Sequence, residues 1–272
     1  MTALPLYHYS SLRHAWDLFE KGLHMSSPFT FNDPFDSYLS YTEYYSGIRA
    51  DPTKKSNVNI EDAIYLNAID DEYIQLGLQS KYRIACLSES LLYSPQWAYY
   101  ADSHKGICVE YDTEKLISYC KSNGIIMGRV RYSAQPLTDC TNTLDLKALI
   151  RSAFNKSEEF AAEKEWRLLK FGDSDFIPIQ DAIRRVYVGC RTHFLWNKDK
   201  TRTETEKLST LRKIIDHCQS EGIDVRMMYP KPGTFDLGYF TEDQISWSSL
   251  TFHIYAERQM IFPSEKHDDD SL

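Results

Sequence analysis

The segment EKEWRLLKF, residues 163–171, decides the fold, because its charged and apolar residues alternate as they do in a β-strand. A period of two puts Glu163, Glu165 and Arg167 on one face and Trp166 on the other. Two carboxylates about 7 Å apart on one face repel each other unless they are solvated or paired. Arg167 is a suitable partner for one of them.

This charged face has two interpretations, which the residues alone leave open. One is a solvent-exposed strand edge, where charge discourages pairing with another chain. The other is a site in which a carboxylate stabilises a positively charged transition state.

Helices and strands surround this segment without the regular βαβ rhythm of a doubly wound sheet. The pattern predicts strands at residues 81–90, 106–112, 126–133, 163–171, 183–189 and 223–230. It predicts helices at residues 10–22, 56–80, 94–103, 113–124, 144–161 and 203–222. We therefore expect an α+β fold with a mostly antiparallel β core and surrounding helices. No linker divides the chain, so we expect one domain over residues 1–262 and a disordered acidic tail at 263–272.

Composition and missing motifs narrow the function. The net charge of -8 over 272 residues does not favour bulk attraction to nucleic acid or to an anionic membrane. Neither a long apolar run nor a secretory signal is recognisable, and the six cysteines are scattered, so we expect reduced thiols in a cytoplasmic protein. Phosphate-binding glycine loops and a nucleophile elbow are not recognisable in the sequence either. The histidines form no ligand pairs, so we expect no metal.

The N-terminal segment YHYSS, residues 7–11, is the second candidate for a site. His8 can donate to a ribose hydroxyl, and Tyr7, Tyr9 or Ser10 can add a contact. The alternative is a short aromatic strand that ends at a helix cap.

Two further segments are open to the same kind of choice. In SSPFTFNDPFD, residues 26–36, Ser26 and Asn32 offer polar groups on a loop, or they only build a turn. In WAYYADSHKG, residues 97–106, Trp97 and Tyr100 share a helix face. That face either packs into the core or offers a ring for stacking.

The order of these four segments is more specific than any one of them. YHYSS, FNDPFD, WAYYADSHKG and EKEWR, between Leu6 and about Cys190, resemble an uncharacterised bacterial domain family. Its motifs read Y-H-Y-[ST]-S, F-N-D-P-F-[DE], W-x-x-Y-A-x-x-H-x-G and E-x-E-W-R. That family is grouped with the ADP-ribosyltransferases.

The resemblance implies roles for individual residues. Glu165 matches the catalytic glutamate, and Glu163 takes the first acidic position of the same motif. His8 would contact the adenosine-side ribose of NAD, and Tyr100 would stack on nicotinamide. The implied NAD-binding set is Tyr7, His8, Tyr9, Ser10, Ser26, Asn32, Trp97 and Tyr100. His8, Tyr100 and Glu165 must then converge on one cleft.

The resemblance also implies a biological setting. The expected function is an NAD-dependent ADP-ribosyltransferase, a bacterial toxin or phage-defence effector, with NAD as co-substrate and no metal. The acceptor is a protein, a nucleic acid or a small molecule, and a cognate antitoxin or defence partner is expected, but no membrane. The alternatives are a non-catalytic nucleotide-sensing or protein-binding module of the same fold and an NAD glycohydrolase.

Overall fold

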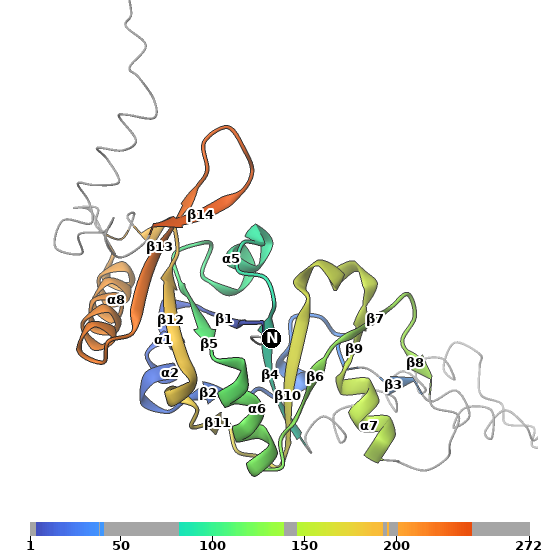
Figure 1. Ribbon diagram of the computed structural model, residues 1–272. Coiled ribbons are helices and arrows are strands. Elements are labelled where there is room, and N and C mark those ends of the chain that lie inside the picture. The colour runs from blue at the N-terminus through green and yellow to red at the C-terminus, as the bar shows by residue number, and fades with distance from the viewer. Residues whose placement is uncertain are drawn as a thin grey trace, which may run out of the picture. The chain divides into compact units, whose positions relative to one another are not determined.

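A computed structural model describes residues 4–37, 39–40, 82–138, 146–192, 195 and 201–240 of the chain. These residues form a mixed α+β structure with a large, mostly antiparallel sheet and six α-helices (Figure 1). The predicted helix at 56–80 and the tail at 263–272 lie outside the described residues. Within the described part, no helix has both the length and the apolar character that crossing a membrane requires.

The chain divides into two compact units, each built from three stretches of sequence. The first unit comprises Met1–Leu6, Asp17–Ser90 and Asp112–Ala182. The second unit comprises Tyr7–Trp16, Leu91–Tyr111 and Ile183–Leu272. The expectation of one domain over residues 1–262 stays a prediction.

Three strands of the large sheet belong to the first unit. The central one is β10 (Glu165–Phe171), with β4 (Tyr82–Ser88) and β6 (Ile126–Arg129) antiparallel on either side. The strand predicted at 163–171 is therefore confirmed, but it begins two residues later. Glu163 ends the 3₁₀-helix Glu158–Glu163, and Lys164 has a left-handed φ of 47°. That turn breaks the extended run, so the prediction that Glu163 lies on the strand is wrong.

Short elements complete the first unit. They are α2 (Asp17–Glu20), β2 (Leu23–His24), the 3₁₀-helix η1 (Pro28–Thr30), β3 (Leu39–Ser40), α6 (Thr113–Ser122), β7 (Arg131–Ser133), β8 (Leu137–Thr138), α7 (Leu146–Ala153), β9 (Asn155–Ser157), β11 (Phe176–Ile177) and the 3₁₀-helix η3 (Gln180–Ala182). Asp112 begins α6 by accepting hydrogen bonds from the backbone N–H groups of Glu114 and Lys115.

The helix predicted at 144–161 is only half present. It ends as α7 at Ala153, and the chain then turns into β9, which pairs in parallel with β7 (Figure 1). Asn155 and Lys156 are buried there. Pairing and burial thus override the local helix preference of the segment.

Five strands of the large sheet belong to the second unit, except that Leu6, the first residue of β1, is assigned to the first unit. Their order is β14 (Leu237–Phe240), β13 (Asp224–Pro230), β12 (Ile183–Val188), β5 (Ile107–Tyr111) and β1 (Leu6–Ser10). β12 runs parallel to β13 and antiparallel to β5, and β14 is antiparallel to β13. Two tyrosines of β1 and the helix α5 (Ser94–Tyr100) contribute to one aromatic core with β5, β12, β13 and β14.

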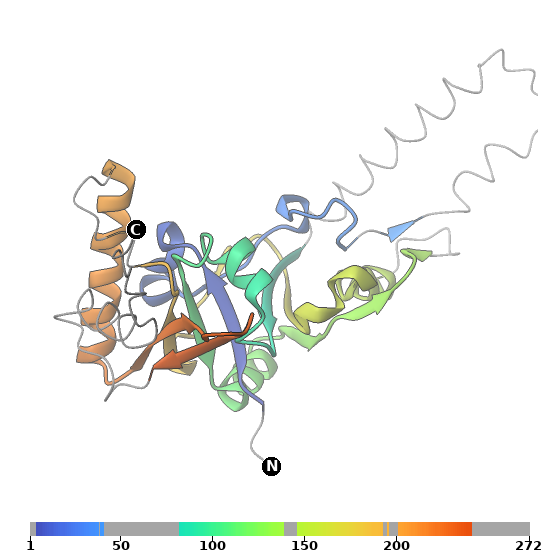
Figure 2. The same ribbon diagram turned by 90° about the horizontal axis from the view of Figure 1, so that it is seen from above.

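The long helix α8 (Arg202–Ser220) packs against β13, and Figure 2 shows it flanking the strands of its unit. Thr201 and Glu204 form a reciprocal capping box at its start. The predicted single helix at 10–22 is instead two short helices, because α1 (Leu12–Ala15) packs against α8 while α2 packs against β2. Trp16 separates the two halves.

Candidate functional site

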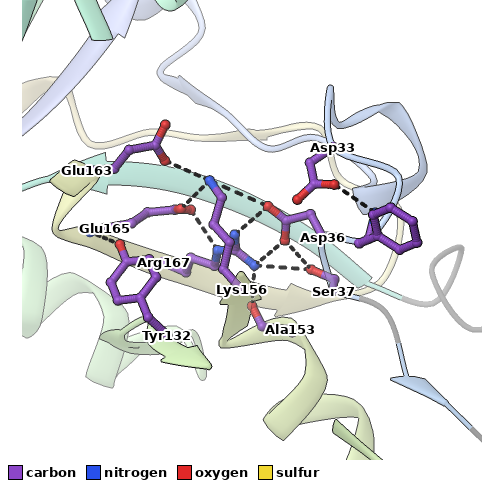
Figure 3. A network of polar contacts seen from close by, with 10 residues as sticks. Asp33, Asp36, Ser37, Tyr132, Ala153, Lys156, Glu163, Glu165 and Arg167 are labelled. Atoms are coloured by element: carbon purple, nitrogen blue, oxygen red, sulfur yellow. Dashed lines mark hydrogen bonds and ion pairs between the residues drawn. The ribbon is translucent and has the colours of Figure 1, made fainter. Parts of the chain in front are cut away.

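Six buried polar side chains of the first unit form one connected network, which we call the charge cluster (Figure 3). Its members are Asp36, Ser37, Lys156, Glu163, Glu165 and Arg167. Each is less than a tenth exposed, and Arg167 is fully buried. Charged side chains at such depth are stable only when they are paired and hydrogen-bonded.

Lys156 lies among all three carboxylates of the charge cluster. Its Nζ atom is 2.7 Å from Oε2 of Glu163 and 2.9 Å from Oε2 of Glu165. A longer ion pair of 3.7 Å joins it to Oδ2 of Asp36. The ammonium group of Lys156, on β9, thereby joins the loop that carries Asp36 to the segment that carries Glu163 and Glu165.

Arg167 connects the other side of the same carboxylates. Its Nε donates to Oε1 of Glu165 at 2.7 Å, and its Nη2 donates to Oδ2 of Asp36 at 2.8 Å. Its Nη1 donates to the Ala153 carbonyl at 2.7 Å and to Oγ of Ser37 at 3.1 Å. The expectation that Arg167 neutralises one glutamate is therefore confirmed, for Glu165.

A turn in the FNDPFD segment delivers the acidic partner of Arg167. Oδ1 of Asp33 accepts a hydrogen bond from the backbone N–H of Phe35, and Ser37 has a left-handed φ of 58°. These contacts point Asp36 toward Arg167, as Figure 3 shows. Asp36 is thus a member of the buried network.

The charge cluster contains more carboxylates than cations. Asp36, Glu163 and Glu165 face Lys156 and Arg167, which leaves a formal net charge of about -1 when all five are ionised. Burial alone would raise the pKa of Glu165, but the positive charges of Arg167 and Lys156 outweigh burial and lower this pKa to about 2. Glu165 is therefore a carboxylate at every physiological pH.

The second unit holds a buried carboxylate in a different electrostatic setting. Glu110 and Asp224 form ion pairs with Arg184, Arg185 and Arg226. The cations outnumber the carboxylates here, so this group has the composition of a structural ion-pair network. The excess of negative charge is a property of the charge cluster in the first unit.

Two further predicted residues of the first unit lie apart from the charge cluster's hydrogen bonds. Ser26 pairs through its backbone with Ile84, and its Oγ lies 3.2 Å from Nδ1 of His24. Asn32 is exposed in the turn before Asp33. Of the predicted residues in this unit, the structure therefore brings together Glu163 and Glu165.

The predicted aromatic residues of the second unit pack into its core. Tyr9 and Trp97 are buried with their rings edge to face at 5.3 Å. The Tyr9 hydroxyl and Nε1 of Trp97 both donate to the Leu91 carbonyl, at 3.1 and 2.7 Å. Tyr7 is 9% exposed and lies against Tyr187. Packing in the core, the alternative to nucleotide binding, therefore already supplies hydrogen-bond partners for the polar atoms of Tyr9 and Trp97.

The remaining predicted residues of the second unit differ in exposure. Ser10 is buried and donates to the Ser11 carbonyl, while His8 is half-buried. Tyr100 is 36% exposed, the most of the predicted set in this unit, and its ring meets Tyr99 edge-on. The convergence of His8, Tyr100 and Glu165 on one cleft stays a prediction, since the first two lie in one unit and Glu165 in the other.

Sequence reasoning missed Lys156, because it assigned this residue to a helix. A single lysine within a helical pattern carries no signal of burial. Asp36 had a signal, since the motif F-N-D-P-F-[DE] ends in an acidic residue. Among the described residues, no group of three or more His, Cys, Asp or Glu side chains is arranged to hold a metal ion.

Comparison with known proteins adds one match. No curated protein matches the chain, and no solved structure matches it. One family model matches a part of the chain that runs from α5 into β10 and includes Lys156, Glu163, Glu165 and Arg167. The match covers residues 96–168, and the family is described as a protein of unknown function, DUF2971.

Proposed function

We propose that this protein transfers ADP-ribose from NAD to an acceptor, and that Glu165 stabilises the oxocarbenium-like transition state. The observation that carries the proposal is a buried Glu165, paired with Lys156 and Arg167, inside a charge cluster with one carboxylate in excess. The order of the four sequence motifs supports it and supplies the reaction class.

The electrostatics of the charge cluster suit this chemistry. Breaking the bond between nicotinamide and ribose leaves positive charge on the sugar. A fixed negative potential stabilises that charge most when it has fully developed, which is the requirement for catalysis. Because the ionised Glu165 cannot donate a proton at neutral pH, its role is electrostatic.

Glu165 also keeps capacity to accept a hydrogen bond from a ribose hydroxyl. A carboxylate has about four lone-pair positions. Arg167, Lys156 and the Cys86 thiol occupy three of them. The fourth is the position proposed for the 2′-hydroxyl of the nicotinamide ribose.

The other roles follow from the resemblance to ADP-ribosyltransferases. Glu163, joined to Glu165 through Lys156, is proposed to assist the acceptor. His8 and Tyr100 are proposed to contact the adenosine-side ribose and the nicotinamide ring. The fold would then be a split, mostly antiparallel ADP-ribosyltransferase-like core. We propose a bacterial toxin or phage-defence effector with a cognate antitoxin or defence partner.

A non-catalytic module of the same fold is the second candidate. The observation that favours it is the 4% exposure of Glu165, together with the buried, hydrogen-bonded side chains of Tyr9 and Trp97. Such a module binds a nucleotide or a protein without breaking NAD. It predicts thermal stabilisation by NAD and no release of nicotinamide.

Incubation with labelled NAD separates these functions. The protein is added to a bacterial lysate, nicotinamide release is measured, and labelled macromolecules are digested with protease or nuclease to identify the acceptor class. Glu165→Gln should abolish both signals. Glu159→Gln is the matched control, because Glu159 is exposed on the 3₁₀-helix that ends at Glu163.

The outcomes are distinct. Label on protein or nucleic acid that depends on Glu165 supports the transferase. Nicotinamide release with no labelled acceptor indicates an NAD glycohydrolase. No release by the folded wild-type protein, with an NAD-dependent rise in its unfolding temperature, supports the non-catalytic module. Full activity of Glu165→Gln would remove Glu165 from the mechanism.

A further inference from the structure

A thiol, an imidazole and a hydroxyl lie in a row in the second unit. Sγ of Cys190 is 3.8 Å from Nδ1 of His104, and Nε2 of His104 is 3.5 Å from Oγ of Ser94. We call these three residues the thiol site. When Nε2 carries the proton and donates to Ser94, the lone pair of Nδ1 faces the thiol and can accept its proton.

The backbone holds the imidazole in this place at a cost. Asp102, Ser103 and His104 have φ values of 50°, 54° and 67°, in the left-handed region. Each such residue without the freedom of glycine costs about 1 kcal/mol. Strain of this kind persists only where the surroundings fix it, and it collects at functional positions.

Two contacts fix the strained turn. The His104 ring stacks on Trp97 with an interplanar angle of 12°, and the His104 carbonyl accepts a hydrogen bond from the backbone N–H of Arg191 at 2.9 Å. Gly189 allows the close approach, because a Cβ atom there would lie 2.2 Å from the His104 carbonyl oxygen. The strain thus places His104 beside Cys190, the residue that follows Gly189.

Burial and a nearby positive charge favour the neutral form of His104. Burial first, and then the positive charge of Arg191, lower the pKa of His104 from its ordinary value. The turn's other charged contact is an ion pair of 2.6 Å between Asp102 and Lys207 of α8. A neutral imidazole at pH 7 is able to act as a base.

The other described cysteines are in a different environment. Burial raises the pKa of Cys86, Cys108, Cys120 and Cys218, in the last two cases to about 11 and about 12. Cys108, Cys120 and Cys218 are buried, and buried thiols of this kind are unreactive. Cys86 is half-buried, and the nearby carboxylate of Glu165 raises its pKa further. Cys190 is half-buried and lies in the turn that follows β12, with an imidazole next to its sulfur.

We propose that Cys190 is a site of oxidation by hydroperoxides, with His104 as its base and Ser94 as the residue that orients the imidazole. His104 takes the thiol proton as sulfur attacks one peroxide oxygen. The S–O bond forms, the O–O bond breaks, and the leaving oxygen takes the proton from His104. The products are a sulfenic acid on Cys190 and one molecule of water or alcohol. This site uses none of the residues assigned to ADP-ribose transfer from the charge cluster.

The test measures the reaction of each cysteine in the folded, full-length protein. Hydrogen peroxide is added at a series of pH values, sulfenic acid is trapped with dimedone, and labelled peptides are quantified by mass spectrometry. With His104 as base, the rate at Cys190 should stay level from pH 8 down to about 6.5 and fall only where the imidazole is protonated. A thiol without a base should lose about tenfold in rate per pH unit below about 8.5.

His104→Asn removes the base while keeping a residue that tolerates positive φ. In this variant the rate at Cys190 should become steeply dependent on pH, as for an ordinary thiol. Ser94→Ala should lower the plateau by a smaller factor. His14→Gln, at an exposed position of α1, is the matched control and should leave the profile unchanged.

Two results would overturn the proposal. One is a steep profile for Cys190 in the wild-type protein, and this result does not depend on any variant folding. The other is an unchanged plateau in His104→Asn whose thermal unfolding curve matches that of the wild type. Either result would make the row of three side chains purely structural.

Discussion

Replacing Lys156 by methionine tests whether the charge cluster carries an excess of negative charge. Methionine keeps the length and volume of the side chain and removes its charge. The formal charge of the cluster changes from about -1 to about -2, because one positive charge is removed. All three carboxylates lose a partner, since Nζ of Lys156 lies 2.7, 2.9 and 3.7 Å from Glu163, Glu165 and Asp36. Removing one partner of a buried ion pair costs about 3–5 kcal/mol of unfolding free energy. For a chain of this size, the unfolding midpoint should fall by about 10 °C.

Glu163→Gln changes the charge in the opposite direction, from about -1 to zero. It should cost at most about 1.5 kcal/mol, because the lost hydrogen bond is offset by weaker repulsion among the carboxylates. The double variant returns the charge to about -1, so its cost should be smaller than the sum of the single costs by about 1–3 kcal/mol. Equilibrium unfolding in urea measures all three values.

Lys21→Met is the surface control for these measurements. Lys21 forms an ion pair of 2.9 Å with Asp17 at the surface, and such pairs contribute little to stability, so this change should leave the unfolding free energy nearly unchanged. The reasoning fails if Lys156→Met and Glu163→Gln destabilise the protein equally. It also fails if the two changes add without coupling.

Three further predictions follow from single contacts. Glu165 has a lowered pKa, so its contribution to stability should be complete above pH 4.5 and disappear as the pH falls toward 2. Unfolding free energies measured across this pH range should show the loss, and Glu165→Gln should not show this pH dependence. Gly189→Ala puts a Cβ atom 2.2 Å from the His104 carbonyl and should cost about 1–3 kcal/mol in urea unfolding, whereas Gly128→Ala, which meets only the movable Phe154 ring, should cost less. Thr201→Ala removes the capping box of α8 and should cost about 1 kcal/mol, read as a lower unfolding midpoint.

Local patterns predicted much of the secondary structure. The two-residue alternation predicted β10, and the helical pattern at residues 203–222 predicted α8 to within two residues at each end. The patterns failed where the conformation of a segment depends on pairing with a strand that is distant in the sequence. The period of α7 continues past Ala153, and only the pairing of β9 with β7 reveals that the chain is extended there.

The candidate site was predictable only in part, for the same reason. The spacing of Glu163, Glu165 and Arg167 pointed to a charged group, but it left an exposed strand edge and a catalytic carboxylate as alternatives, and neither predicted a buried network. The decisive partners, Lys156 and Asp36, come from other segments. Burial depends on what covers a strand, and a period of two does not contain that information.

The separation of these partners along the chain affects how the protein is made. Asp36 and Arg167 are 131 residues apart. A ribosome adding about 5–20 residues per second needs roughly 10 s to synthesise that interval. Until Arg167 emerges, the loop that carries Asp36 has no counter-charge from β10 and cannot settle into its native position. The first unit therefore completes its folding only after β10 has been synthesised, and a chain truncated before β10 should be a substrate for chaperones and proteases.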